Sequence, residues 1–181
     1  MDIINTPETI NDTVIDFCKT IVMDSVPEYV LVHPESWCKE NECYANVEQK
    51  IKNSGGMRQL GWRIQISKGI MIEAVHHAIW ISETGEKIDI TPQPYSAKNI
   101  VFLSDDSTKF DKYRIGEKYQ ALCKCSLINK YVYLCNLESV KYKNKTRLEQ
   151  QPNIPQELLD KQAKLLAKIA ETHKLYRRKR G

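Results

Sequence analysis

The sequence predicts an α+β fold in which an antiparallel sheet packs against a helix that begins at a cysteine, with a peripheral helix at the C-terminus. Two observations carry this prediction. Apolar residues recur at helical spacing near the N-terminus and again after residue 155, whereas between residues 61 and 90 they follow a period of two. The chain has 181 residues, 41% of them hydrophobic, which suffices for a sizeable core.

Three helices are expected, each from its own boundary signals. Thr6-Pro7 resembles a cap followed by proline at the first helical position, and the apolar face after it predicts a helix over 7–23. A second helix over 43–56 ends at two glycines. Pro155 opens the last helix, whose apolar stripe runs to Ile169.

The other periodic segments are expected to be strands. A short strand over 28–34 ends at a proline, and the turn "SETGE" joins a long strand to a short one in a hairpin, with "WRIQI" as a third strand. "NIVFL" at 99–103 is a further strand. The segments "YQALCKCSLI" and "KYVYLCNL" flank Asn129-Lys130, which predicts another hairpin there.

The charge distribution suggests a core domain over 1–150 and a C-terminal helix with a basic tail over 151–181. Residues 155–181 carry eight Lys and Arg against three acidic side chains, although the whole chain has a net charge of only +4. The tail ends in Arg177, Arg178, Lys179 and Arg180. This run either binds nucleic acid or another acidic partner, or only stabilises the helix by its interaction with the negative, C-terminal end of the helix dipole.

Neither a membrane segment nor a secretory signal is expected. No apolar run approaches the roughly 20 residues of a membrane span, and the N-terminus lacks a basic and apolar leader. The expected location is therefore the cytoplasm, where the six cysteines would be free thiols. Cys123, Cys125 and Cys135 are expected to be buried hydrophobic residues, and no metal or cofactor is predicted.

The stretch "HHAIWISETGEKIDITP" at 76–92 suggests chemistry when it is combined with Cys43. A cysteine at a helix start feels the positive end of the dipole, which favours the thiolate. A thiolate nucleophile needs an imidazole to manage protons, and the imidazole needs an acceptor that orients it. His77 and Asp89 lie 12 positions apart across the predicted hairpin, where they can be cross-strand neighbours on one face.

These residues resemble the core of the transglutaminase-like proteins within the papain-like cysteine superfamily. "CYANV" matches the cysteine at a helix start, "HAIW" the histidine strand, and "DIT" the aspartate strand, over residues 37–103. A group of uncharacterised microbial proteins shares the "HHAIW…DITP" stretch. The resemblance implies a cysteine-dependent acyl transfer on a protein or peptide amide by a peptidase, amidase, deamidase or transglutaminase. The alternative is a non-catalytic binding module of the same fold, which would recognise protein or nucleic acid through the basic tail.

Several other side chains are secondary candidates. Cys38 is a competing nucleophile, and His76 leaves the strand on the opposite face from His77, where it would be exposed or structural. An oxyanion would be bound by the Cys43 backbone N–H and by a side chain just upstream, either Trp37 or Asn41.

Two aromatic residues of the strands leave a further choice open. Trp62 and Trp80 either pack the sheet or line a substrate groove.

Overall fold

The computed structural model describes residues 4–93, 97–108, 113–148 and 150–178, without the side chains of residue 145 and residues 173–178. Its fold is α+β, as predicted, with helices and one sheet. The chain divides into two compact units. The sheet unit comprises residues 6–65 and 74–110, and the helical unit comprises residues 1–5, 66–73 and 111–181. This division differs from the boundary expected near residue 150, because residues 111–150 group with the C-terminal helix.

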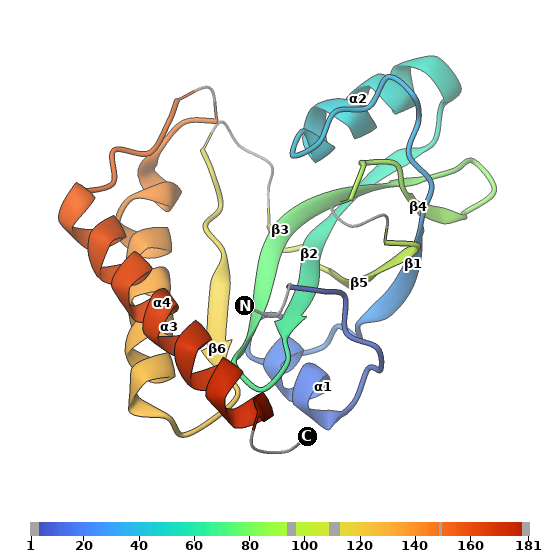
Figure 1. Ribbon diagram of the computed structural model, residues 1–181. Coiled ribbons are helices and arrows are strands. Elements are labelled where there is room, and N and C mark those ends of the chain that lie inside the picture. The colour runs from blue at the N-terminus through green and yellow to red at the C-terminus, as the bar shows by residue number, and fades with distance from the viewer. Residues whose placement is uncertain (1–3, 94–96, 109–112, 149, 179–181) are drawn as a thin grey trace. The chain divides into compact units, whose positions relative to one another are not determined.

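The sheet closes on itself. Its strand order is β2-β5-β1-β4-β3-β6, and a further pairing of β2 with β3 joins the first five strands into a ring (Figure 1). The strands are β1 (Glu28–Val32), β2 (Met57–Ser67), β3 (Met71–Ile81), β4 (Lys87–Asp89), β5 (Asn99–Ser104) and β6 (Lys118–Ala121).

The expectation of a purely antiparallel sheet is wrong. β1 pairs with β4 in parallel, whereas β1–β5, β2–β5 and β3–β4 are antiparallel. The turn after β3 determines only how β4 pairs with β3. The other edge of β4 meets β1, and the long connection between these two strands, which contains a helix and two strands, allows the parallel pairing.

The first helix is shorter than predicted. α1 spans Asp12–Lys19, and its cap is Asn11, whose side chain accepts the Val14 N–H at 3.2 Å. The expected cap at Thr6-Pro7 instead contacts the sheet. The Thr6 hydroxyl donates to the Asn99 carbonyl, and the Pro7 carbonyl accepts the Tyr29 hydroxyl. These contacts hold the segment extended ahead of the helix.

The second helix begins and ends close to its predicted limits. α2 spans Cys43–Ser54 and stops at Gly55, which has a positive φ of 68°. Cys43 and Val47 face Ala78, Trp80 and Ile90 in one buried cluster, so α2 covers the part of the sheet formed by β3 and β4. A second cluster, formed by Val30, Ile79, Ile100 and Phe102, connects β1, β3 and β5.

The predicted hairpin around Asn129-Lys130 is wrong. Only β6 is a strand there, and α3 follows over Ser126–Lys141. The β-branched and aromatic residues of "KYVYL" favour a strand locally. However, Ile128, Val132 and Cys135 are buried at helical spacing, and the first two pack against Ile70, Met71 and Ile169. Tertiary burial therefore decides the helix.

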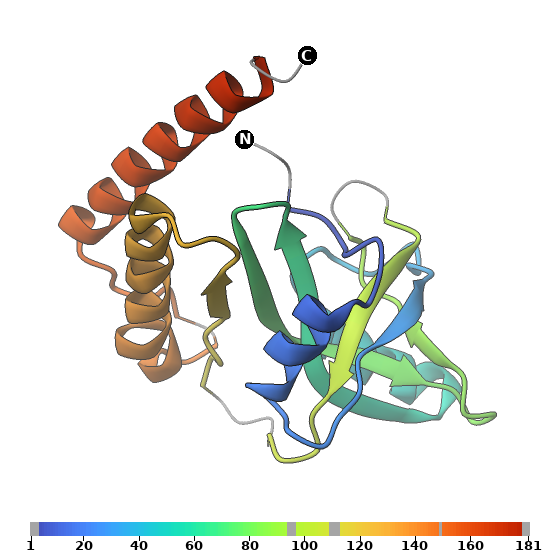
Figure 2. The same cartoon turned by 90° about the horizontal axis from the view of Figure 1, so that it is seen from below.

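The C-terminal helix begins where the proline predicts. α4 spans Gln156–Arg178, and the N–H groups of Leu158 and Leu159 donate to the Pro155 carbonyl. α3 and α4 lie side by side in both views (Figures 1 and 2). The side chains of Arg177 and Arg178, and all of Lys179 and Arg180, lie outside the described residues. Within the described chain, no helix has both the length and the apolar run that a membrane crossing requires.

Candidate active site

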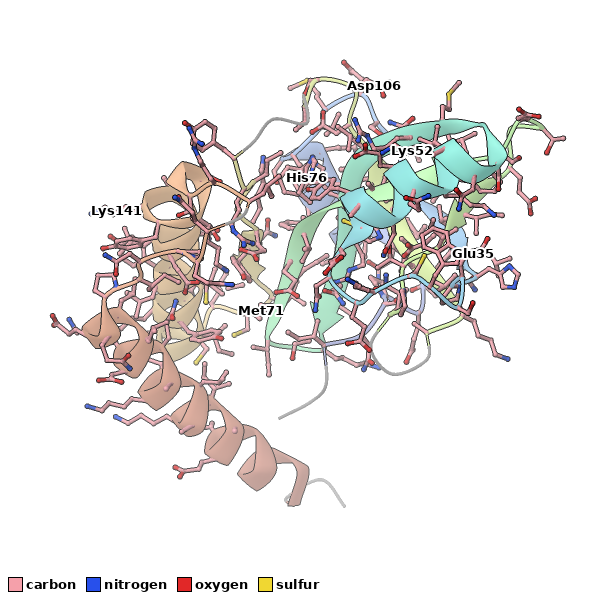
Figure 3. The ribbon with its side chains drawn as sticks, turned by 90° about the horizontal axis from the view of Figure 1, so that it is seen from above. Glu35, Lys52, Met71, His76, Asp106 and Lys141 are labelled. Carbon is pink, nitrogen blue, oxygen red and sulfur yellow. The ribbon has the colours of Figure 1, made fainter. Side chains whose placement is uncertain are left out.

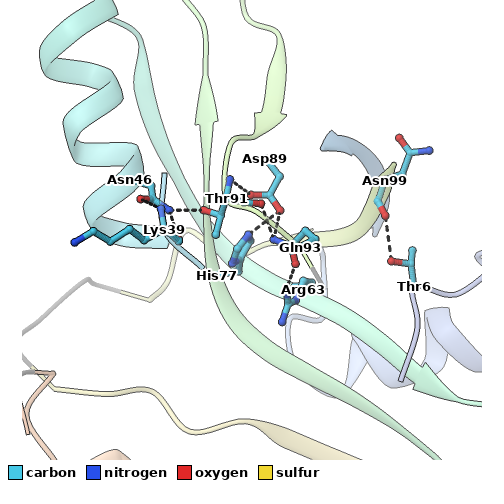
Figure 4. A network of polar contacts seen from close by, with 9 residues as sticks. All are labelled: Thr6, Lys39, Asn46, Arg63, His77, Asp89, Thr91, Gln93 and Asn99. Atoms are coloured by element: carbon cyan, nitrogen blue, oxygen red, sulfur yellow. Dashed lines mark hydrogen bonds and ion pairs between the residues drawn. The ribbon is translucent and has the colours of Figure 1, made fainter. Parts of the chain in front are cut away.

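The loop before α2 positions Cys43 through one buried side chain. Asn46 accepts the Lys39 N–H at 3.1 Å and donates to the Lys39 carbonyl at 2.8 Å, so it pairs with the backbone of the loop on both sides of one residue. Its amide also donates to the Thr91 hydroxyl at 3.2 Å (Figure 4). Asn46 thus connects the start of α2 to the chain segment just after β4.

His77 and Asp89 meet across the β3–β4 hairpin. Trp80 faces Ile88 in this register, which puts Asp89 and His77 at diagonal positions on one face. His77 Nε2 lies 3.0 Å from Asp89 Oδ2, and both side chains are at most 5% exposed. When the imidazole is protonated, this contact is a buried ion pair.

Cys43 forms a hydrogen bond with the same imidazole. Burial, the largest influence on the Cys43 thiol, raises its pKa, but the charge of His77, the hydrogen bond to it and the Ala78 N–H lower the pKa overall. Burial lowers the pKa of His77, whereas the charges of Asp89 and Cys43 raise it more, to about 10. The lowered pKa of Cys43 and the raised pKa of His77 both favour a thiolate beside an imidazolium.

Asp89 is held by two further donors. Its Oδ1 accepts the Thr91 N–H at 3.0 Å, and its Oδ2 accepts the Gln93 amide at 2.7 Å. Gln93 Oε1 in turn accepts Arg63 Nη1 from β2 (Figure 4). Sequence reasoning missed Gln93, Arg63 and Asn46. Gln93 follows Asp89 by four positions, but nothing in the sequence indicates that a β2 arginine meets it.

The competing nucleophile Cys38 lies near Cys43 but in a different electrostatic setting. Its side chain is half-buried and packs against the cluster that contains Cys43. Burial raises the pKa of the Cys38 thiol, and the nearby charges of Glu35 and Asp89 raise it further. The geometry favours Cys43 as the thiolate.

His76 lies on the opposite face of β3 from His77, and it is buried, which fits the structural one of its two expected roles. His76 is labelled in Figure 3. Its Nδ1 is 2.6 Å from the Tyr44 hydroxyl of α2. Its ring also meets the edge of Trp62, with a distance of 5.0 Å between ring centroids. His76 therefore connects β3 to α2 and β2, one residue away from the imidazole that contacts Cys43.

The two tryptophans of the strands are in the core. Trp62 donates its indole N–H to Asp105 Oδ2 at 2.9 Å, and Trp80 donates to the Gly55 carbonyl at 3.0 Å. Lys50 Nζ lies 4.8 Å above the Trp80 ring. Both indoles pack the sheet in this conformation and do not line an open groove.

The two oxyanion candidates belong to the loop before α2. Trp37 is 39% exposed, and Asn41 is exposed with a φ of 60°. Cys43 is the first residue of α2, so the ladder of that helix does not use its backbone N–H. This donor, which lies on the same residue as the thiol, is the best-placed oxyanion donor.

The remaining cysteines do not form a metal site with these residues. Cys135 is buried in α3, as expected, but the expectation of a buried Cys125 is wrong, because that residue is exposed at the start of the helix. Across the described part of the chain, no three His, Cys, Asp or Glu side chains gather as metal ligands.

Comparison of the chain with protein-family models, curated proteins and solved structures finds no match. Inferences about the function of this protein therefore depend on the site itself. That site brings together Cys43 of α2, His77 of β3 and Asp89 of β4.

Proposed function

We propose that this protein is a cysteine-dependent acyl-transfer enzyme that acts on an amide of a protein or peptide. The observation that carries the proposal is the buried chain of contacts from Cys43 through His77 to Asp89. Three elements that are separate in sequence supply these side chains. Their arrangement has the three parts that thiol acyl transfer needs, which are a thiolate, a proton carrier and an acceptor that orients it.

In the proposed reaction the Cys43 thiolate attacks the amide carbonyl carbon, and the carbonyl oxygen becomes an oxyanion near the start of α2. The His77 imidazolium gives its proton to the amide nitrogen, the C–N bond breaks and the amine leaves. This step yields a thioester on Cys43 and a neutral imidazole. His77 then takes a proton from water or from an acceptor amine, which attacks the thioester and regenerates the thiolate.

Asp89 has two roles in this proposal. Its carboxylate stabilises the imidazolium, and it maintains the ring orientation in which Nε2 faces Asp89 and the other nitrogen is free for the thiol. Gln93 and the Thr91 N–H hold the carboxylate in turn. They are positioning residues, because they act on the reaction only through Asp89.

One observation favours the second candidate, a non-catalytic module of the same fold. Cys43, His77 and Asp89 are only 6%, 4% and 0% exposed. The open hollow beside α2 is lined by Glu48, Ile51, Lys52, Met57 and Arg58 and does not include them. In that case the three side chains would be a satisfied polar cluster in the core, and no acyl group would reach Cys43.

An activated ester distinguishes the two candidates without knowledge of the natural substrate. Mixing p-nitrophenyl acetate with a Cys125→Ala background, which lacks the exposed thiol before α3, should release a rapid burst of nitrophenolate close to one per chain, and peptide mass spectrometry should place the acetyl group on Cys43. In this background Cys43→Ala should abolish the burst, whereas the matched control Cys38→Ala should retain it. An unchanged burst in Cys43→Ala, or no burst in the background protein, would exclude the enzyme proposal.

A further inference from the structure

Two cysteines that the candidate active site does not include lie in the helical unit, at the start of α3. Cys125 is the residue that caps α3, and its side chain is exposed. Cys123, two residues earlier, is half-buried against the cluster that contains Ile70, Met71 and Ile128. The acyl-transfer proposal uses neither thiol.

The two cysteines are in direct contact. The Cys125 backbone N–H donates to Cys123 Sγ at 3.3 Å. The side chain of Asn129 donates to the Cys125 carbonyl at 2.9 Å and to the Cys123 carbonyl at 3.3 Å. One α3 side chain therefore binds the backbone at both cysteines.

We propose that Cys123 and Cys125 form a redox-active dithiol, which a small-molecule disulfide such as oxidised glutathione converts into an intramolecular disulfide. Cys125 is the attacking thiol, because it is exposed and occupies the N-terminal cap of α3. Cys123 is the resolving thiol, since it is more buried and already contacts Cys125.

The chemistry of the pair favours this order of events. The nearby backbone N–H groups of Ile128 and Leu127 lower the pKa of Cys125, which favours its thiolate. By contrast, burial raises the pKa of Cys135 to about 11 and that of Cys18 to about 12. Cys135 is also ten positions along α3 from Cys125, or about 15 Å of helix, so it cannot be the resolving thiol.

The exchange proceeds in two balanced steps. The Cys125 thiolate attacks one sulfur of oxidised glutathione, which forms a Cys125–glutathione disulfide and releases one glutathione thiolate. Cys123 then loses its proton and attacks Cys125 Sγ, which forms the Cys123–Cys125 bond and releases the second glutathione thiolate. The protein loses two electrons and two protons, and one oxidised glutathione becomes two reduced molecules.

The short spacing makes the disulfide reversible. Two residues span at most about 7 Å when extended, which is just outside the usual Cα separation of a disulfide. The disulfide would close a small ring at an exposed position, and exposed disulfides are easily reduced. We infer a switch rather than a permanent crosslink.

Trypsin provides a direct test, because it cleaves after Lys124, between the two cysteines. The full chain is incubated with oxidised glutathione near neutral pH, blocked with a thiol reagent, digested and analysed by mass spectrometry. We expect the peptides 119–124 and 125–130 to remain joined, with the loss of two hydrogen atoms. Dithiothreitol should separate them.

Two variants identify the roles of the thiols. Cys123→Ser should accumulate a stable glutathione adduct on Cys125, and Cys125→Ser should react at residue 123 at least about tenfold more slowly. The matched control Cys135→Ser should behave like the unmodified protein.

The disulfide between Cys123 and Cys125 is expected to form in Cys43→Ala as well, so the outcome does not depend on the acyl-transfer proposal. Peptides that stay separate and unmodified in the oxidised protein would overturn the inference. So would a glutathione adduct that persists equally with and without Cys123.

Discussion

α2 and α3 both begin beside a cysteine, but the two thiols have different surroundings. Cys43 is the first residue of α2 and is buried, whereas Cys125 precedes α3 and is exposed. The pKa of both thiols is lowered. At Cys43 burial has a large opposing effect, and the charge of His77 lowers the pKa. At Cys125 backbone N–H groups lower it.

A lowered thiol pKa and the ability to carry out acyl transfer are separate properties. A helix start is enough to make an exposed thiol more acidic. A buried thiol needs a charged partner as well, and acyl transfer needs a group that also carries protons. Only Cys43 has such a partner, because β3 and β4 bring an imidazole and a carboxylate to the start of α2.

Removing the charge of Asp89 should produce the largest difference between the two thiols. Asp89→Asn should slow acetylation of Cys43 by about 10²- to 10⁴-fold, by analogy with other triads. Each oxygen of Asp89 now accepts a donor, so the new amide NH₂ group would face a donor in either orientation. Burst kinetics with p-nitrophenyl acetate would measure the loss, and circular dichroism would establish that the variant is folded. Cys125 alkylation should not change, and a parallel decrease at Cys125 would indicate general unfolding.

Removing the imidazole should change the reactivity of one thiol only. In His77→Ala, iodoacetamide labelling of Cys43 near pH 7 should slow by about tenfold or more, because burial then raises the thiol pKa without compensation. Labelling of Cys125 should be the same in both proteins, since the groups that lower its pKa are the α3 backbone and Cys123, not His77. Timed quenching followed by peptide mass spectrometry would give both rates. Equal Cys43 rates with and without the imidazole would contradict the proposed pair.

The pH dependence of stability should reveal the ion pair. The folded pKa of His77, about 10, is above its unfolded value of 6.5, so its contribution to stability declines as pH rises between these values and is lost above about pH 10. The folded pKa of Cys43 is below its unfolded value of 9.0, so its contribution grows as pH rises toward 9. The two slopes oppose each other in the unmodified protein.

Cys43→Ala should therefore lose unfolding free energy more steeply than the unmodified protein between about pH 6.5 and 9. The limit for one proton is about 1.4 kcal/mol per pH unit. Asp89, the main group that raises the pKa of His77, is still present in this variant. Urea denaturation at several pH values would measure the slopes, with Cys125→Ala as the control. Parallel slopes for Cys43→Ala and the unmodified protein would mean that no ion pair forms.

The smallest effect on chemistry is expected at the neighbouring histidine. His76→Ala should cost about 2 to 4 kcal/mol of unfolding free energy, because it leaves a gap in the core and removes the partner of the Tyr44 hydroxyl. Acetylation of Cys43 in the folded variant should change by less than about tenfold, or 1.4 kcal/mol in activation free energy. An effect as large as that of His77→Ala would mean that His76 takes part in the reaction. Tyr44→Phe, which retains the ring, should show the same pattern with a smaller loss of stability.

Local patterns predicted much of the sheet unit. The period of two located β2, β3 and β4, and the segment "NIVFL" located β5. The alternation of side chains on β3 separated His76 from His77. The short turn after β3 was enough to predict that His77 and Asp89 lie on one face. These features depend on residues close together in the chain, so short-range stereochemistry determines them.

The helical unit shows where local patterns were insufficient. The residues of α3 include aromatic and β-branched side chains that favour strands, and only packing against Ile70, Met71 and Ile169 identifies the segment as a helix. Because a hairpin was predicted in place of α3, Cys125 was not expected at a helix start. A sequence pattern that is ambiguous in period is resolved by contacts with distant residues.

The sequence by itself determined which residue types can do chemistry and how the hairpin pairs two of them. Only the tertiary structure decided that β1 and β4 run parallel, that the Gln93–Arg63 pair holds Asp89, and that Cys43 meets the imidazole. The physical reason is that pKa values and hydrogen bonds depend on distance in space and on burial. Distances in space and burial cannot be read from the spacing of residues along the chain. Closure of the sheet brings α2, β2 and β3 together although they are separate in sequence.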